Sequence, residues 1–145
     1  MPSLKDPAAR AALVARLDRL SPDTKALWGR MSAPKMLAHM TDACRMAIGE
    51  LPVRPKKIPL IGSFPFKQLV IYVLPFPKNS PTAPEIVARA PEAFEVEKAS
   101  VKTLIARLGG DVTYASHPIF GALTPAEWGT LGYKHFDHHL RQFGV

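Results

Sequence analysis

The sequence has a single cysteine, Cys44, among 145 residues. One thiol excludes an intramolecular disulfide framework and any cysteine-rich zinc site. The first ten residues contain charges and alanines rather than the apolar stretch of an export signal, so we expect a cytoplasmic protein. Prolines and Lys67 interrupt the most apolar stretch, residues 58–76, before it reaches the roughly 18 residues that a membrane span needs. We therefore expect no membrane partner.

Acidic residues are scarce: 12 Asp and Glu stand against 19 Lys and Arg, which gives a net charge of +7. Such a balance is a reason to consider nucleic-acid binding. The dense basic patch is confined to Arg54, Lys56 and Lys57, however, and no aromatic side chain is interleaved there to stack on bases. Scattered basic residues on solvated helix faces explain the charge more simply, so we expect no nucleic-acid partner.

Hydrophobic residues make up 47% of the chain, which is typical of a globular protein, and the length fits one domain over residues 1–145. Nine of the 15 prolines lie between Pro52 and Pro91, so this stretch does not form one long helix. Within it, residues 69–74 (LVIYVL) have the composition of a strand. The alternatives for this segment are a short helix or turn packed on the rest of the protein, and a lid over a pocket.

Outside the proline-rich stretch, several segments begin with a capping side chain followed by proline. The last of these, Thr124-Pro125-Ala126-Glu127, is a capping box. The expected helices are residues 7–20, a short one over 21–30, and longer ones over 32–49, 91–108 and 124–143. Four long helical segments without a convincing sheet predict an all-α bundle.

The last predicted helix contains three of the five histidines. At about 100° per residue, one narrow arc is expected to face inward. This arc contains Trp128, Leu131, His135, His139 and Gln142. The opposite arc contains Glu127, Thr130, Lys134, Asp137 and Arg141. His135 and His139 therefore stack one turn apart on the core side, and His138 lies at the edge of the arc.

An unpaired imidazole nitrogen in a core costs about 2 kcal/mol or more. A shared metal ion would satisfy both His135 and His139, since their i, i+4 spacing suits one ion. The alternative is a pair of core histidines bonded to carbonyls, hydroxyls or water. His39, near the edge of the apolar stripe of its helix, is the candidate for a third ligand or, alternatively, a structural histidine. His117 precedes Pro118 and is expected to be a loop or supporting residue.

Other singled-out residues have simpler interpretations. We expect Cys44 to be a core thiol, and Trp28 and Trp128 to be packing anchors. Asp42 is expected either to orient His39 or to be solvated or ion-paired. Glu97 lies close to the inward arc of its helix, where it is a candidate buried partner for a histidine or for Arg45.

Two blocks, WGRMSAPKMLAHMTDACRMAIGE (residues 28–50) and HPIFGALTPAEWGTLGYKHFDHHLRQFG (residues 117–144), resemble the DinB-like (DinB/YfiT-like) superfamily. They are most similar to an uncharacterised branch with this C-terminal signature. The resemblance implies a four-helix up-down-down-up bundle, often dimeric; here a proline-rich connection joins the middle helices. It also implies a divalent metal held by one histidine of the second helix and an HxxxH pair of the last, which correspond to His39, His135 and His139. His138 is a competing ligand.

Relatives in that superfamily include transferases and isomerases that depend on a metal and on a low-molecular-weight thiol. The leading hypothesis is therefore an enzyme that uses a divalent metal, zinc or nickel, and attacks a small electrophilic substrate with a thiol in transferase- or hydrolase-type chemistry. No organic cofactor is expected, and no catalytic residue beyond the ligands is identified. The alternative is a non-catalytic helical module for stress-associated binding or dimerisation, whose metal is structural or absent.

Overall fold

Three of the four long helices begin where the sequence provides a capping side chain. The computed structural model describes residues 1–145 and contains only helices, turns and loops, with no strand. Helix α1 (Pro7–Asp18) is capped by Asp6, α2 (Ala33–Ala47) by Ser32, and α5 (Pro125–Gln142) by the predicted capping box of Thr124 and Glu127. Helix α4 (Phe94–Gly109) has no side-chain cap. The all-α prediction is confirmed.

The predicted short helix over residues 21–30 is wrong, since these residues form turns and bends. The Leu27 N–H donates to the Gln142 carbonyl at the end of α5 (2.7 Å), and Gly29 has a φ of +79°. Both features take the backbone out of a helical path. Helix α4 begins at Phe94 instead of residue 91, because the Glu92 N–H donates to the Glu97 side chain and Ala93 is not helical.

The strand interpretation of residues 69–74 is also wrong. The segment folds as a one-turn helix α3 (Phe66–Gln68) that continues into a π-helical turn η1 (Leu69–Val73). No neighbouring strand is present to pair with it. Backbone groups instead pair within the segment, as in the bond from the Leu74 N–H to the Leu69 carbonyl, or accept from the Lys134 side chain. Ile71 is fully buried against Phe120 and Leu131. The alternative prediction of a short helix packed on the rest of the protein is therefore confirmed.

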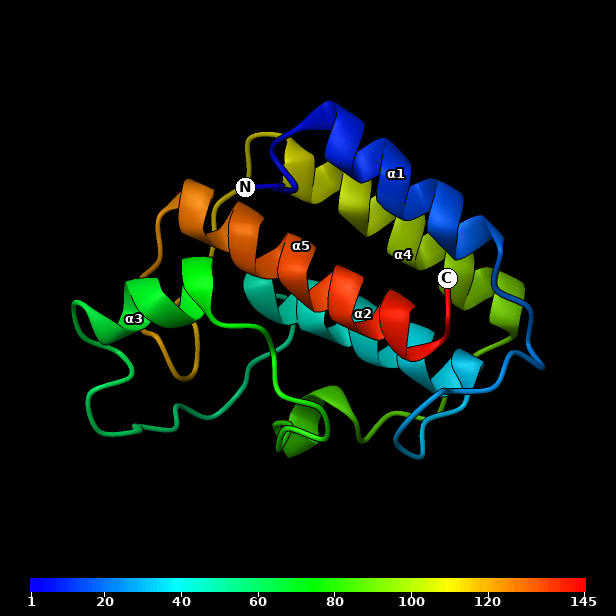
Figure 1. Cartoon of the computed structure of the whole chain (residues 1–145), viewed down its shortest axis with the longest axis horizontal. Coiled ribbons are helices and arrows are strands. Elements are labelled where there is room, and N and C mark those ends of the chain that lie inside the picture. The colour runs from blue at the N-terminus through cyan, green and yellow to red at the C-terminus, as the bar shows by residue number, and fades with distance from the viewer.

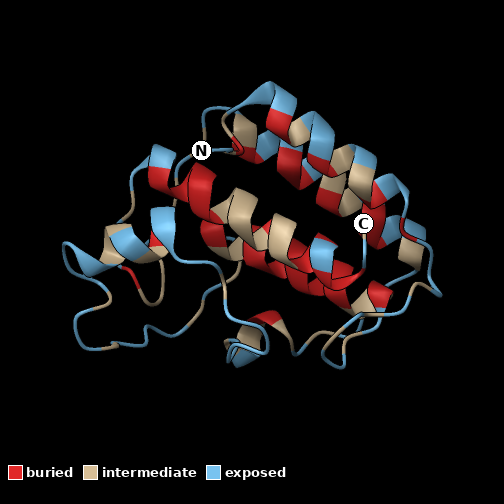
Figure 2. Ribbon diagram, in the orientation of Figure 1, coloured by how far each residue is buried: buried red, intermediate tan, exposed pale blue.

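The four long helices lie side by side (Figure 1), with α2 packed along α4, α1 against α4 and α5, and α5 also against α2. Leucines and methionines on the facing sides form the main core, and the buried positions in Figure 2 follow those sides. The core includes Leu13, Leu17, Met36, Leu37, Met40, Val101, Ile105, Phe136 and Leu140. None of the helices combines the length and the apolar composition that a membrane-spanning helix requires.

Helix α5 is buried on more than the predicted inward arc. Phe136, Leu140 and Phe143 are buried in the main core. Glu127 and Thr130, which lie on the arc opposite the predicted inward one, are also buried. The cause for Glu127 is tertiary: Gln68 and Lys67 of α3 reach its carboxylate (both 3.4 Å).

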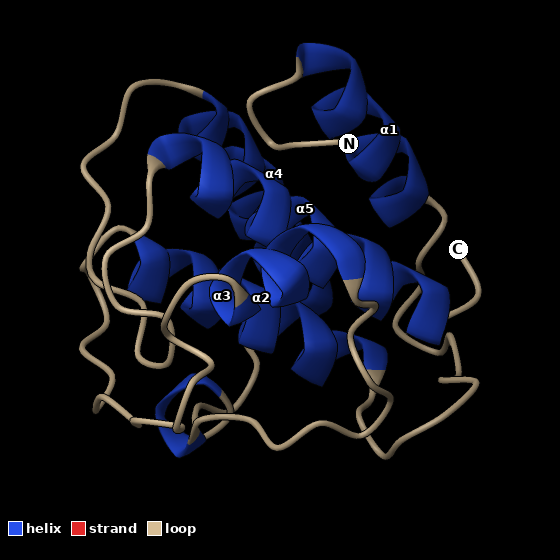
Figure 3. Cartoon of the chain, turned by 60° about the vertical axis from the view of Figure 1, so that its left-hand side comes forward, coloured by secondary structure: helices blue, strands red, loops and turns tan.

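The proline-rich residues that connect α2 to α4 cross the molecule outside the long helices (Figure 3). They first form α3 and η1, which pack on α5, and then the 3-10 turn η2 (Pro84–Ile86), which packs on α2. The connection thus contacts both α2, which contains His39, and α5, which contains His135 and His139.

Candidate metal site

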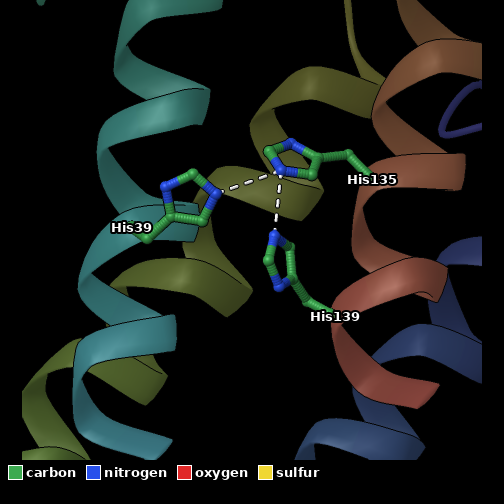
Figure 4. A group of neighbouring side chains, drawn as sticks. All are labelled: His39, His135 and His139. Atoms are coloured by element: carbon green, nitrogen blue, oxygen red, sulfur yellow. Dashed lines mark hydrogen bonds between the residues drawn. The ribbon is translucent and has the colours of Figure 1, made fainter. Parts of the chain in front are cut away.

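Three histidines from two helices converge on one point. His39 is on α2, and His135 and His139 lie one turn apart on α5, as Figure 4 shows. The Nε2 atom of His135 lies 3.1 Å from Nε2 of His39 and 3.2 Å from Nε2 of His139. One ligand atom from each ring lies within 4.8 Å of the others. His39 and His139 are buried, and His135 is half-buried.

The outer nitrogens of two rings contact fixed acceptors. His39 Nδ1 lies 2.9 Å from the Ile86 carbonyl oxygen, and His139 Nδ1 lies 2.8 Å from Gln142 Oε1. The Gln142 amide is oriented by its own donation to the Trp28 carbonyl (2.9 Å). Because these oxygens only accept, the hydrogen-bond network assigns a proton to Nδ1 of both His39 and His139.

This proton assignment leaves too few protons at the centre of the triad. In neutral His39 and His139, Nε2 is then a lone pair, and both lone pairs face Nε2 of His135. His135 Nε2 has at most one hydrogen and can donate it to one neighbour only. At least one of the two close contacts therefore joins two lone pairs.

A bound cation would convert this repulsion into coordination. Ligand nitrogens about 2.0–2.1 Å from zinc are about 3.3 Å apart in a tetrahedral site, close to the 3.1 and 3.2 Å that separate the Nε2 atoms here. Hydrogen bonds from Nδ1 to a carbonyl or amide oxygen are also the usual supports of metal-binding histidines. The three side chains therefore fit a divalent ion.

The rings are held in the neutral form that a metal needs. Burial lowers the pKa of His139 to about 3 and also lowers the pKa of His39, against the opposing effect of its hydrogen bond to Ile86. Burial, followed by the neighbouring histidines, lowers the pKa of His135 well below its usual value. Near neutral pH, none of the three rings therefore carries the second proton that would make it a cation and oppose a metal ion.

Aromatic side chains surround the triad on the α5 side. The Phe76 ring lies 5.9 Å from the His135 ring and 6.0 Å from the His138 ring. His138 also packs edge-on against Trp28 (5.9 Å), so its ring lies among aromatic neighbours and does not join the triad. Lys134 donates to three carbonyls of the preceding segment, those of Val70, Ile71 and Leu74, and so holds η1 against α5.

Asp42 and Glu97 form a buried ion-pair cluster with Arg89, a residue that the sequence did not single out. Arg89 donates to Asp42 (3.2 Å) and to both carboxylate oxygens of Glu97. Asp42 is thus ion-paired, which confirms one of the two alternatives predicted for it. The predicted partners of Glu97 are wrong: Arg89 and Thr41 contact it, while Arg45 lies near Asp42 instead (3.6 Å).

The remaining singled-out residues have structural surroundings. Cys44 is buried in the core, and burial raises the pKa of its thiol to about 12. His117 Nδ1 accepts from the Ile119 and Phe120 N–H groups, and burial lowers the pKa of this loop histidine to about 4. Trp128 stacks on Tyr114 with ring centroids 5.5 Å apart.

Sequence reasoning did not assign a role to three groups that support the triad: the Gln142 amide, the Ile86 carbonyl and the Phe76 ring. Gln142 was detectable, since it is polar, lies on the inward arc and follows His139 by three residues. Ile86 and Phe76 come from the proline-rich connection, and no local pattern places them beside a histidine.

A family model described as a protein of unknown function (DUF1569) matches residues 3–144. The matched residues include α2 and α5 and therefore all three histidines of the triad. No curated protein and no solved structure matches the chain.

Proposed function

Since the chain belongs to the DUF1569 family, whose description assigns no activity, we propose its function from the site: a divalent-metal-dependent enzyme that acts on a small electrophilic substrate. One observation carries the proposal, namely the convergence of three Nε2 atoms with too few protons to satisfy one another. Imidazole ligands suit both zinc and nickel, and these are the ions we propose.

Three protein ligands would leave a coordination position of a bound ion open to a reactant. No carboxylate, thiol or fourth imidazole joins His39, His135 and His139 within ligand range. Three ligands plus an open position are typical of catalytic zinc sites, whereas structural sites are closed by a fourth protein ligand. A site with three protein ligands therefore favours an enzyme over a non-catalytic module with a structural metal.

The chain's own residues would orient the ligands and exclude water. Ile86 and Gln142 hold the rings of His39 and His139 through Nδ1, and the Phe76 ring packs over His135. A divalent ion there would supply Lewis acidity that lowers the pKa of a bound low-molecular-weight thiol. The thiol sulfur would then bond to an electrophilic carbon while the leaving group departs with its electron pair and the thiol proton passes to water.

The resemblance to the DinB-like superfamily is the source of the thiol step. We further propose that the four long helices form its up-down-down-up bundle, that the protein is cytoplasmic and that a homodimer is its assembly. The mutual packing of the long helices and the location of the triad on the second and last of them support the bundle.

The test is metal and thiol binding by protein purified without a histidine tag. We expect close to one equivalent of Zn²⁺ or Ni²⁺ by elemental analysis or by calorimetric titration of metal-free protein. With Co²⁺ in the site, a small thiol should add a thiolate-to-metal absorption band if a position is open. Absence of any ion uptake would overturn the metal site; uptake without the thiol band would leave a closed, non-catalytic site and overturn the enzyme.

A further inference from the structure

The segment around α3 and η1 exposes large apolar side chains that the long helices do not cover. Seven of the ten exposed large hydrophobic residues of the chain fall within residues 60–74. We call them the apolar patch: Leu60, Phe64, Phe66, Leu69, Tyr72, Val73 and Leu74. Figure 1 shows α3 at one end of the molecule, beside the start of α5, and Figure 2 colours much of this region as exposed.

The segment is apolar on both of its faces. Ile71 points inward and is fully buried against Phe120 and Leu131. Phe66, Leu69 and Val73 follow one another at spacings of three and four residues and remain 43%, 41% and 66% exposed. Packing on α5 therefore explains the inner face only. A clustered exposed apolar surface of this kind marks a contact with a partner or a membrane.

The charged side chains of the segment that contains the apolar patch all have one sign. Residues 51–84 include five basic side chains and no acidic one. Arg54, Lys56 and Lys57 are exposed, and Lys57 lines one shallow hollow together with Leu60 of the patch. This charge pattern disfavours a second copy of the chain as the occupant, because two such surfaces would repel each other. It fits a negatively charged partner.

We propose that the apolar patch and its basic flank bind the surface of an anionic lipid bilayer. Phe64 is 81% exposed at the turn before α3, and an aromatic side chain at a protruding turn suits insertion among lipid headgroups. Lysines and arginines beside it would be attracted to anionic lipids. The earlier expectation of no membrane partner followed from the lack of a spanning helix, and contact with a membrane surface does not require one.

Co-sedimentation of the full-length protein with lipid vesicles tests the proposal. We expect binding to vesicles of phosphatidylcholine mixed with phosphatidylglycerol, little binding to phosphatidylcholine alone, and weakening by added salt. The partition coefficient should fall about tenfold or more in Phe64→Ser/Val73→Ser and in Lys56→Glu/Lys57→Glu. All substituted side chains are exposed, so circular dichroism should show an unchanged fold.

Matched controls separate this site from adsorption driven by the net charge of +7. Leu27→Ser/Val96→Ser removes two exposed apolar side chains elsewhere, and Lys25→Glu/Arg30→Glu makes the same charge change elsewhere. Both controls should retain binding within about twofold. Equal loss in patch and control variants, equal binding to neutral vesicles, or no binding by the wild type would overturn the proposal. A wild-type dimer that Phe64→Ser/Val73→Ser converts to a monomer would identify a second copy as the occupant and also overturn it.

Discussion

At the scale of single residues, the orientation and protonation of two triad rings are determined by the acceptor oxygens that bind their Nδ1 atoms. The Ile86 carbonyl and the Gln142 amide oxygen fix the Nδ1 proton on His39 and His139, and this turns both Nε2 lone pairs toward His135. The His39 and His139 imidazoles are thereby oriented before any ligand arrives, which reduces the entropy that is lost on binding. His138 lacks this arrangement, since its ring lies between Trp28 and Phe76.

We predict that His39→Ala, His135→Ala and His139→Ala each abolish or severely weaken metal binding, while His138→Ala does not. Each of the first three variants leaves only two ligands on the ion, and a two-ligand site is weak. Isothermal titration of metal-free proteins with Zn²⁺ measures the effect, and His138→Ala serves as the matched control. Retention of metal by His139→Ala with loss in His138→Ala would show that the wrong histidine of the pair was assigned.

At the scale of elements, the chain from η2 to the start of α4 ties two helices together and supports the triad. Arg89 bonds to Asp42 on α2 and to Glu97 on α4, and its own carbonyl accepts from Lys35 Nζ (2.6 Å). Three residues earlier, the Ile86 carbonyl contacts His39. The ion-pair cluster therefore holds in place the segment from η2 to α4, whose Ile86 carbonyl orients His39.

We predict that Arg89→Ala lowers the free energy of unfolding by about 2–3 kcal/mol, because it leaves the buried Asp42 and Glu97 carboxylates without their partner. Metal affinity should fall as well, since Ile86 is released. Arg141→Ala is the control: it breaks an ion pair with Asp137 (2.9 Å) whose arginine is 72% exposed, and should cost less than about 1 kcal/mol. Urea unfolding of the two metal-free variants would measure their stabilities, and titration with Zn²⁺ would measure their metal affinities. Equal losses of stability in Arg89→Ala and Arg141→Ala would refute a special role for Arg89.

At the scale of the whole molecule, several buried histidines make stability depend on pH. The pKa values of His39, His117, His135 and His139 are all lowered, to about 4 for His117 and about 3 for His139. An unfolded histidine takes up its proton near pH 6.5, whereas these folded ones do so only at lower pH. The unfolded state therefore binds more protons below pH 6.5, and acid favours unfolding.

We predict that the metal-free protein loses stability between pH 7.5 and 5.5, by about 1.3 kcal/mol for each histidine that stays neutral in the folded state. The lowered pKa of Glu97, to which the Arg89 bond contributes, adds a further loss only below about pH 4.5. Urea denaturation at the two pH values, with a chelator present, measures the change. His117→Asn keeps an acceptor for the Ile119 and Phe120 N–H groups but removes one titrating ring.

That variant should show a pH dependence reduced by about one histidine's contribution, 1.3 kcal/mol over the same interval. Bound Zn²⁺ should stabilise the protein by a similar amount at both pH values, because the lowered pKa values keep the triad imidazoles of the folded state neutral and leave few protons to compete with the metal. Stability that is flat or rises on acidification would contradict the burial of neutral histidines.

The sequence by itself determined the features that depend on neighbouring residues. The Asp6, Ser32 and Thr124 caps act within three residues, so the starts of α1, α2 and α5 were predictable. The i, i+4 spacing likewise placed His135 and His139 on one side of α5. For His39, the helix position allowed a third ligand, and the resemblance to the DinB-like superfamily pointed to it. Metal binding by the three residues stays a prediction.

Only the tertiary structure decided what depends on contacts between distant segments. Residues 69–73 have a strand's composition but form a helical turn, since no second strand is there to pair with them. Glu97 pairs with Arg89 rather than with Arg45, and Ile86 supplies the acceptor for His39. Spacing along a helix fixes the direction of a side chain within that helix. The partner that it meets depends on how the proline-rich connection packs against α2, α4 and α5, and that packing is governed by burial summed over the whole chain.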